Sequence, residues 1–271
     1  MRYPDLFPLL GLSSAAQACA VGTVAPPSLT LVPPFPSPGF PPALIPIWLR
    51  PNGLEYFGYW RHFFVERTLT LVSCLGEDGF TVTEVARSTE QLFTWTCIHY
   101  LSALGGPTPA LRAFAAAVGV DLDACDAASR KVGDDPAALA HRPPFAVDPP
   151  AELARHAPGH YRGDFPLPGQ PLTGEHLSRL CALELPPSER QRVAARSDAP
   201  PWLRGGDPAP VFDALFAEGN FGGAWMALQA PGWPVDRAAE ALGRLASASS
   251  DPALKALAAA WIAEPRQIAA Y

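Results

Sequence analysis

One stretch, residues 44–104, constrains the fold of this chain more than any other. It holds short runs in which apolar and polar side chains alternate, and turn signals at Pro51-Asn52-Gly53 and Gly76-Glu77-Asp78-Gly79 separate some of these runs. Alternation with period two is typical of strands, and strands that follow one another so closely favour antiparallel pairing. The sequence therefore predicts an antiparallel meander with strands at residues 45–49, 54–61, 67–75 and 80–85.

A helix follows the predicted meander directly. Ser88 is a favourable N-cap, and Gln91 stands three residues later in the capping-box arrangement. Gly105-Gly106-Pro107 ends the helical pattern, because glycine supplies the left-handed cap and proline cannot continue the helix. We expect this helix to pack its apolar stripe on the sheet, whose apolar face has to be covered.

The two ends of the chain have a different character. Residues 21–43 are rich in proline, which disfavours helix and ladder hydrogen bonds, so we expect an extended lead-in. Beyond Pro107 the pattern is that of short helices, with proline and glycine breaks between residues 132 and 172. The expected fold class is α+β, an antiparallel sheet covered by a helix and followed by a mainly helical C-terminal region. The predicted division is residues 1–106 against residues 107–271.

Composition limits the possible functions. The chain has 271 residues, 48% of them hydrophobic, which suffices for a packed core. Its net charge of −6 argues against nucleic acid as a partner and is compatible with a basic protein. The five cysteines form no CxxC pair, so a reducing, cytoplasmic setting is expected. No run reaches the length of a membrane span, and Pro4, Asp5 and Pro8 interrupt an N-terminal stretch that loosely imitates a signal peptide.

Catalytic motifs do not emerge from the sequence. It contains no GxxxxGK[ST], GxGxxG or GxSxG pattern. His156 and His160 lie four residues apart, but Pro158-Gly159 stands between them, which favours exposed loop histidines over a zinc site. His62 and His99 have no serine or cysteine nucleophile at a recognisable spacing. We therefore predict no catalytic residue, no cofactor and no metal ligand.

Aromatic and acidic side chains gather around the second predicted strand. Half of the aromatic set 56–64 should be core, and the other half should form an exposed patch unless the helical tail covers it. Acidic residues near strands and turns are most often plain solvated surface, but they could also form a patch for a cationic partner or a catalytic carboxylate pair. The residues predicted to bind a partner are Glu55, Tyr56, Tyr59, Trp60, Glu77 and Asp78.

This central stretch resembles the C-terminal half of SUKH-superfamily domains. In that family a strand of the "l(I)PIa" type leads to a turn, a "yYgy" strand, further strands and a closing "vA-S" helix. The positions that match are Ile45-Pro46-Ile47, Tyr56, Gly58-Tyr59, Val85-Ala86 and Ser88. The chain departs from the family where the proline-rich segment replaces the usual N-terminal helix pair and acidic entry, and where the long helical tail is added.

The resemblance implies a bacterial, non-enzymatic binding domain. Many such domains are immunity proteins that neutralise a cognate toxin, often a nuclease or deaminase, by occluding its active site. The implied partner is a protein toxin, which the acidic charge suggests is basic. Two alternatives stay open from the residues alone. One is a hydrolytic enzyme with a carboxylate and histidine site between sheet and tail, and the other is a scaffold that binds through its helical tail.

Overall fold

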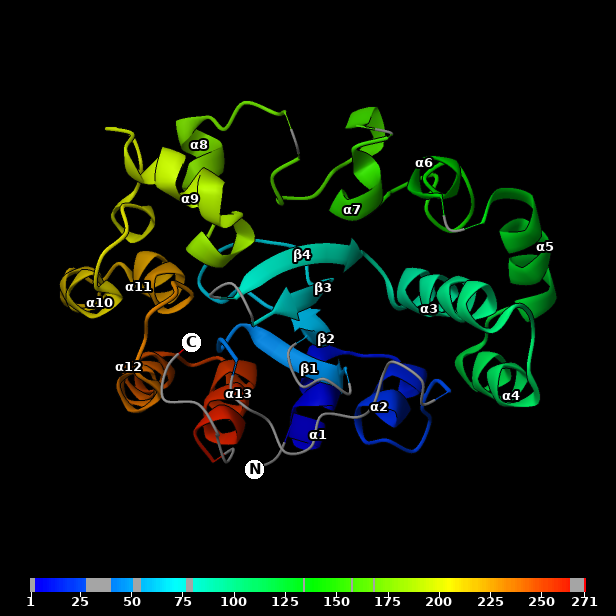
Figure 1. Cartoon of the computed structure of the whole chain (residues 1–271). Coiled ribbons are helices and arrows are strands. Elements are labelled where there is room, and N and C mark those ends of the chain that lie inside the picture. The colour runs from blue at the N-terminus through cyan, green and yellow to red at the C-terminus, as the bar shows by residue number, and fades with distance from the viewer. Residues whose placement is uncertain are drawn as a thin grey trace.

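A four-stranded antiparallel sheet lies at the centre of the computed structural model (Figure 1). The strands pair in chain order, which confirms the predicted meander. They are β1 (Leu44–Leu49), β2 (Glu55–Trp60), β3 (Thr70–Leu75) and β4 (Thr81–Ala86). The structure describes residues 3–27, 40–50, 55–76, 80–133, 135–156, 158–167, 169–263 and 271.

Helices surround the sheet, which makes the fold α+β as predicted (Figure 1). In the N-terminal half they are α1 (Tyr3–Leu6), η1 (Phe7–Leu10), α2 (Ser14–Ala20), α3 (Thr89–Leu104), α4 (Pro109–Val118), α5 (Leu122–Val132) and α6 (Pro136–Leu139). They continue as α7 (Ala151–Ala154), η2 (Pro158–His160), α8 (Gly174–Leu177), η3 (Ala182–Glu184), α9 (Pro187–Ala194) and η4 (Pro201–Leu203). The last four are α10 (Pro208–Ala217), α11 (Phe221–Leu228), α12 (Val235–Ala248) and α13 (Pro252–Ala263). None of the described helices is both long and apolar enough to cross a membrane.

The predicted helix after the sheet is α3, and its two caps are those that the sequence indicates. The Ser88 hydroxyl accepts the backbone N–H of Gln91, and Gly105 ends the helix with φ of 69°. The Gln91 side chain accepts the N–H of Arg87 and donates to the carbonyl of Asp148, 57 residues away. The start of α3 therefore also holds a distant loop in place.

Both faces of the sheet are covered by helices. On one face Phe57 lies 6.2 Å from Trp95 of α3, between ring centroids. On the other face α11 and α13 approach, where the Gln229 side chain accepts the backbone N–H of Ala43 and the Trp261 indole donates to the carbonyl of Phe40. Every residue of β1 is buried, as expected for an apolar run inside a sheet covered on both sides.

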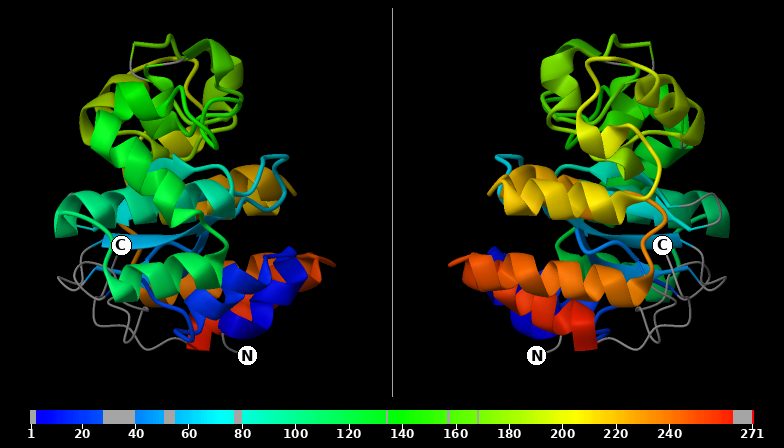
Figure 2. Two further views of the ribbon diagram at one scale, coloured as in Figure 1. Left: turned by 90° about the vertical axis from the view of Figure 1, so that its right-hand side faces the viewer. Right: turned by 90° about the vertical axis from the view of Figure 1, so that its left-hand side faces the viewer.

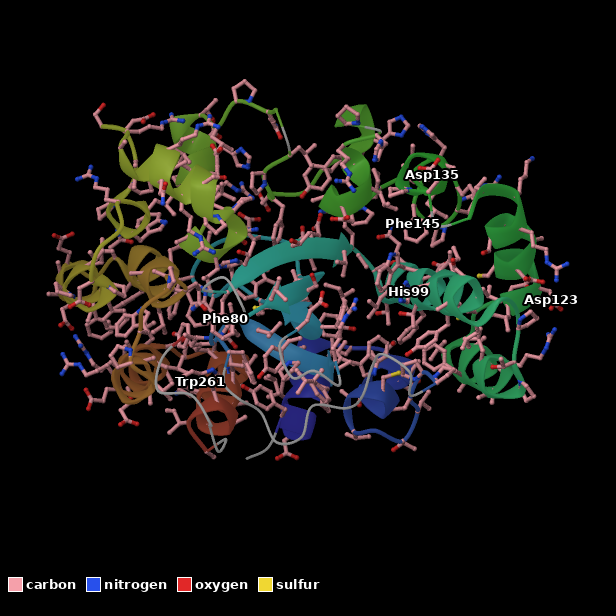
Figure 3. All side chains as sticks on the ribbon, viewed as in Figure 1. Phe80, His99, Asp123, Asp135, Phe145 and Trp261 are labelled. Atoms are coloured by element: carbon pink, nitrogen blue, oxygen red, sulfur yellow. The ribbon has the colours of Figure 1, made fainter. Side chains whose placement is uncertain are left out.

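One apolar cluster joins the two regions that the sequence analysis separated. It includes side chains from Tyr3 in α1 to Tyr271 and draws on both residues 1–106 and 107–271. The tail does not stand apart from the sheet, because α11 and α13 lie beside it, with α10 packed on α11 and α12 packed on α13 (Figures 1 and 2). Trp261 and Phe145 are fully buried in this interior, whereas Asp123 lies at the rim (Figure 3). Among the described residues, this cluster therefore includes side chains from both sides of position 107.

Part of the proline-rich lead-in and two turns fall outside the description. Residues 28–39 of the predicted extended lead-in are not described, and neither are residues 51–54 and 77–79, where the two turns are predicted. Phe40 is described, and it is buried with its ring 5.2 Å from that of Tyr56.

Gly58 in β2 stands where the two backbones come unusually close. Its partner in β1 is Pro46, next to a bulge between Pro46 and Trp48. A Cβ atom on Gly58 would clash with the carbonyl oxygen of Ile45 and lie 2.9 Å from the Cα atom of Pro46. These neighbours are backbone atoms, so they cannot rotate away.

We expect Gly58→Ala to lower the free energy of unfolding by about 1–3 kcal/mol, as overpacking does. Gly243→Ala in α12 is the matched control. Its added methyl group would meet only the end of the Ile262 side chain, at 4.0 Å, and alanine favours helix. Urea denaturation of both variants measures the difference, and equal stability of the two would contradict the close approach.

Candidate functional site: a buried ion cluster and the loop it holds

Glu184, in η3, is a carboxylate buried against the sheet. It is 2% exposed and accepts hydrogen bonds from four groups. The indole N–H of Trp60 donates over 2.7 Å and the backbone N–H of Cys181 over 2.9 Å. Arg67 Nη1 lies 2.8 Å from Oε2, and His62 Nε2 lies 3.2 Å from Oε1. We call Glu184, Arg67 and His62 the buried ion cluster.

His62 is neutral in this cluster, and its tautomer is set by a tryptophan. The indole N–H of Trp225 can only donate, and it points to His62 Nδ1 over 3.2 Å. Nδ1 is therefore the acceptor, and Nε2 carries the proton that it donates to Glu184. Burial lowers the pKa of His62, and the nearby positive charge of Arg67 lowers it further.

Three metal-ligating side chains meet here, but they do not fit a divalent cation. The donor atoms of His62, Cys181 and Glu184 lie within 4.8 Å of one another. The Nε2 atom of His62 carries a proton, and burial raises the pKa of the Cys181 thiol well above its ordinary value. Arg67 Nη1 lies 3.1 Å from Nε2. The guanidinium supplies the positive charge that a metal would bring.

The pKa of Glu184 reflects two opposing causes. Burial alone would raise the pKa of this carboxyl, whereas the charge of Arg67 and the hydrogen bond from His62 lower it. The lowering wins, because the guanidinium is in direct contact and its own side chain is only 3% exposed. Glu184 is therefore ionised throughout the neutral range.

The pH dependence of stability follows from this shift. Glu184 titrates near pH 4.5 in the unfolded chain and lower in the folded one. Its contribution to stability is complete above that pH and is lost as pH falls below it. When the pH falls from 7 to 3.5, we expect the free energy of unfolding of the wild type to decrease by about 1 kcal/mol more than that of Glu184→Gln.

Urea denaturation at the two pH values measures this difference. Glu84 and Glu55 have raised pKa values, mainly through burial, and contribute with the opposite sign. They are present in both proteins, so subtracting one pH profile from the other isolates Glu184. Parallel profiles would contradict the assigned shift.

A second buried carboxylate, Glu84 of β4, also binds only protein groups. Its Oε1 accepts from the Thr70 hydroxyl over 2.6 Å and from Arg87 over 3.1 Å. Its Oε2 accepts the backbone N–H of Ala151 over 2.9 Å. Burial raises the pKa of Glu84 and, more strongly, that of Tyr161, whose hydroxyl bonds to it. These contacts hold α7 and the residues after it against β4.

The enzyme alternative requires a pocket where two carboxylates converge. A cavity of about 150 Å³ does lie between β4 and residues 151–186, and both Glu84 and Glu184 line it. Both carboxylates, however, are at most 2% exposed and already accept from protein donors on each oxygen. The arrangement is that of structural carboxylates and not of a base awaiting a substrate.

Three of the other five histidines, His99, His156 and His160, have protein groups as neighbours. His156 and His160 are exposed, as expected. His156 Nε2 accepts from its neighbour Arg155, whereas His160 Nδ1 lies 3.1 Å from the carbonyl of Ala146. His99 is stacked on Trp95 in α3, with ring centroids 5.4 Å apart.

The buried ion cluster fixes the loop between β2 and β3, residues 61–69. His62 and Phe63 enter the interior at its start, and the ring of Phe63 meets that of Trp225 edge to face at 5.2 Å. Arg67 enters near its end and reaches Glu184. Phe64 lies between these anchors and is 40% exposed.

Phe64 also has an unfavourable backbone conformation. Its φ is +63°, in the left-handed region that a bulky side chain rarely adopts. Strain of this kind persists only where the surroundings impose it, and it is enriched at functional positions. The anchors on both sides of Phe64 are those surroundings.

A row of aromatic rings runs from Phe64 back into the core. Successive centroids are 5.8 Å apart from Phe64 to Phe221, 5.3 Å from Phe221 to Phe216 and 5.7 Å from Phe216 to Phe212. Phe212 is buried, and Arg244 covers Phe216 at 4.5 Å from its ring centroid. We call these four phenylalanines the aromatic row. The other three, on α10 and α11, give Phe64 a rigid support.

The structure buries three of the six predicted partner residues. Tyr56, Tyr59 and Trp60 are 1%, 4% and 1% exposed, because α3 covers one face of β2 and α11 and α13 cover the other. Of the two outcomes left open for the aromatic set, exposure or coverage by the chain itself, the structure shows coverage for these three residues. Glu55 is half-buried and paired with Arg50, and Glu77 and Asp78 lie outside the described residues.

Phe64 belongs to the aromatic set that the sequence singled out, but it was not among the six predicted residues. Its position just past the end of a strand was the available signal, since loops carry binding residues more often than strands do.

Comparison of the chain with family models, curated proteins and solved structures returns no match.

Proposed function

We propose that this protein is a non-catalytic binding protein of the immunity type, which neutralises a cognate bacterial toxin by occluding it. The observation that carries the proposal is Phe64, an exposed aromatic side chain on a strained backbone in a loop anchored at both sides. The resemblance of residues 44–104 to SUKH domains points to the same class of function. The proposal places the protein in the bacterial cytoplasm, where it would meet toxins that act there.

Phe64 has the properties of an interface anchor. Aromatic side chains bury a large apolar area on binding and dominate the energetics of many interfaces. The buried ion cluster and the aromatic row order the loop before any partner arrives. Binding therefore costs little conformational entropy at this position, which is the advantage of a preorganised surface.

Charge supplies the second element of the proposal. The chain carries a net charge of −6, so a basic toxin would be attracted from a distance and oriented as it approaches. Glu66, two residues from Phe64, is exposed and available to meet a cationic side chain at the rim of such an interface. Occlusion of the toxin's active site would then need no chemistry from this protein.

The test starts from the product of the neighbouring gene. We expect that product to be toxic when expressed alone, to be silenced by this protein and to form a stoichiometric complex with it. Phe64→Ala should weaken the complex, whereas Val147→Ala should not, although Val147 is 82% exposed. A neighbouring product that is harmless, or toxicity that persists on co-expression, would contradict the proposal.

A further inference from the structure

A partly open apolar cavity lies among the helices that follow residue 181. Its volume is about 180 Å³, and it is bounded by η3, α9, η4, α10 and the end of α11. Its walls include Leu185, Leu203, Val211 and Pro208, and the half-buried ring of Trp202. The buried ion cluster has no side chain in its lining.

The cavity lies where two apolar cores meet without merging. The main cluster contributes Ala227, whereas a second, smaller cluster contributes Leu185, Leu203 and Ala230. Several wall positions carry very small residues, and these leave the space open: Ala182, Ala194, Ala227, Ala230, Gly205 and Gly206. A space of this kind forgoes dispersion contacts and so weakens the fold unless something fills it.

Two polar side chains at the wall, those of Trp202 and Arg190, are engaged with the protein itself. The indole N–H of Trp202 donates to the carbonyl of Leu180 over 2.8 Å. The Arg190 guanidinium donates to the carbonyls of Leu185 and Phe80, each over 2.8 Å. A ligand would therefore meet mainly apolar walls, an indole ring and the edge of a guanidinium, surfaces that favour an aromatic ring.

We propose that this cavity binds a small neutral aromatic molecule with one ring or two fused rings. The size agrees, because an apolar cavity of about 150 Å³ in another protein holds benzene. Gly205 and Gly206 line the cavity, are exposed and carry no side chain, so they leave such a molecule a route in. This binding is separate from the toxin surface, since Phe64 and the other members of the aromatic row do not line the cavity.

The test is a titration of the full chain with indole. Calorimetry and the NMR chemical shifts of the Gly205 and Gly206 amides report binding. We expect saturable binding with a dissociation constant below about 1 mM. Ala194→Trp fills the cavity from α9 and should weaken binding at least tenfold, whereas Ala195→Trp, at the exposed next residue, should not. Gln191→Trp, exposed at the rim, repeats the block should Ala194→Trp fail to fold.

Three outcomes would overturn the assignment. The first is absence of saturable indole binding, and the second is equal binding by the wall and control variants. The third is tighter binding of N-acetyltryptophanamide than of indole, because the cavity would then suit an aromatic side chain of a partner protein better than a free small molecule.

Discussion

Glu184→Gln is expected to lower the free energy of unfolding by about 3–5 kcal/mol, the usual cost of breaking a buried ion pair by removing one partner. Arg67 would stay inside, with its side chain 3% exposed, and would keep only the longer contact of its Nε atom with Asp164, at 3.6 Å. The new amide nitrogen of glutamine is itself a donor. It would face other donors, since Trp60, His62 and the backbone of Cys181 all donate to this position. The loss thus combines a buried charge deprived of its direct partner with unmade hydrogen bonds.

Urea denaturation at pH 7 measures the effect, with Asp123→Asn as the control. Asp123 pairs with Arg112 at the surface, where both side chains are at least half exposed, so its substitution should change stability little. The double variant Glu184→Gln, Arg67→Met should lose less than the sum of the two single variants, because the stranded charge is gone. A loss below about 1 kcal/mol in Glu184→Gln would contradict the description of the cluster.

The same substitution should loosen the β2–β3 loop. Because Arg67 ties the loop to η3, its release should raise amide hydrogen exchange across residues 62–67 more than in α12, which lies away from the cluster. Equal protection in both segments would indicate that Phe63 and the aromatic row hold the loop without the ion cluster.

Phe64→Gly is expected to separate binding from stability. Glycine relieves the strain at φ of +63°, which offsets the lost contact with Phe221, so the free energy of unfolding should stay within about 1 kcal/mol of the wild type. If Phe64 is the interface anchor, its removal should weaken the toxin complex by about 30-fold or more, the range of a hot-spot residue.

Its neighbour supplies the matched control. Phe63→Ala removes a ring that is 4% exposed and packs on Trp225, so it should cost about 3–5 kcal/mol of stability. Adjacent phenylalanines would then affect different properties, Phe63 the fold and Phe64 the complex. Calorimetric titration with the partner and urea denaturation measure the two properties. Unchanged affinity in Phe64→Gly would remove Phe64 from the proposed interface.

Local patterns were sufficient for the sheet and for α3. Alternation along β2 and β3 and the Ser88 and Gly105 caps act over a few residues, so the chain shows them directly. The close approach at Gly58 comes together with a bulge in the facing strand. Such features depend on the residues themselves and their immediate neighbours.

Which side chains are accessible depends on tertiary packing and could not be predicted from local patterns. Tyr56, Tyr59 and Trp60 alternate as strand residues do, but whether a face is open depends on helices that follow far along the chain. Glu184 meets His62 across 122 positions, a separation at which sequence spacing carries no signal. The meander and its closing helix could be predicted from the sequence, because short-range sterics and hydrogen bonding specify them. The burial of the aromatic set, the ion cluster and the exposure of Phe64 were decided by long-range packing, because burial is a property of the whole core.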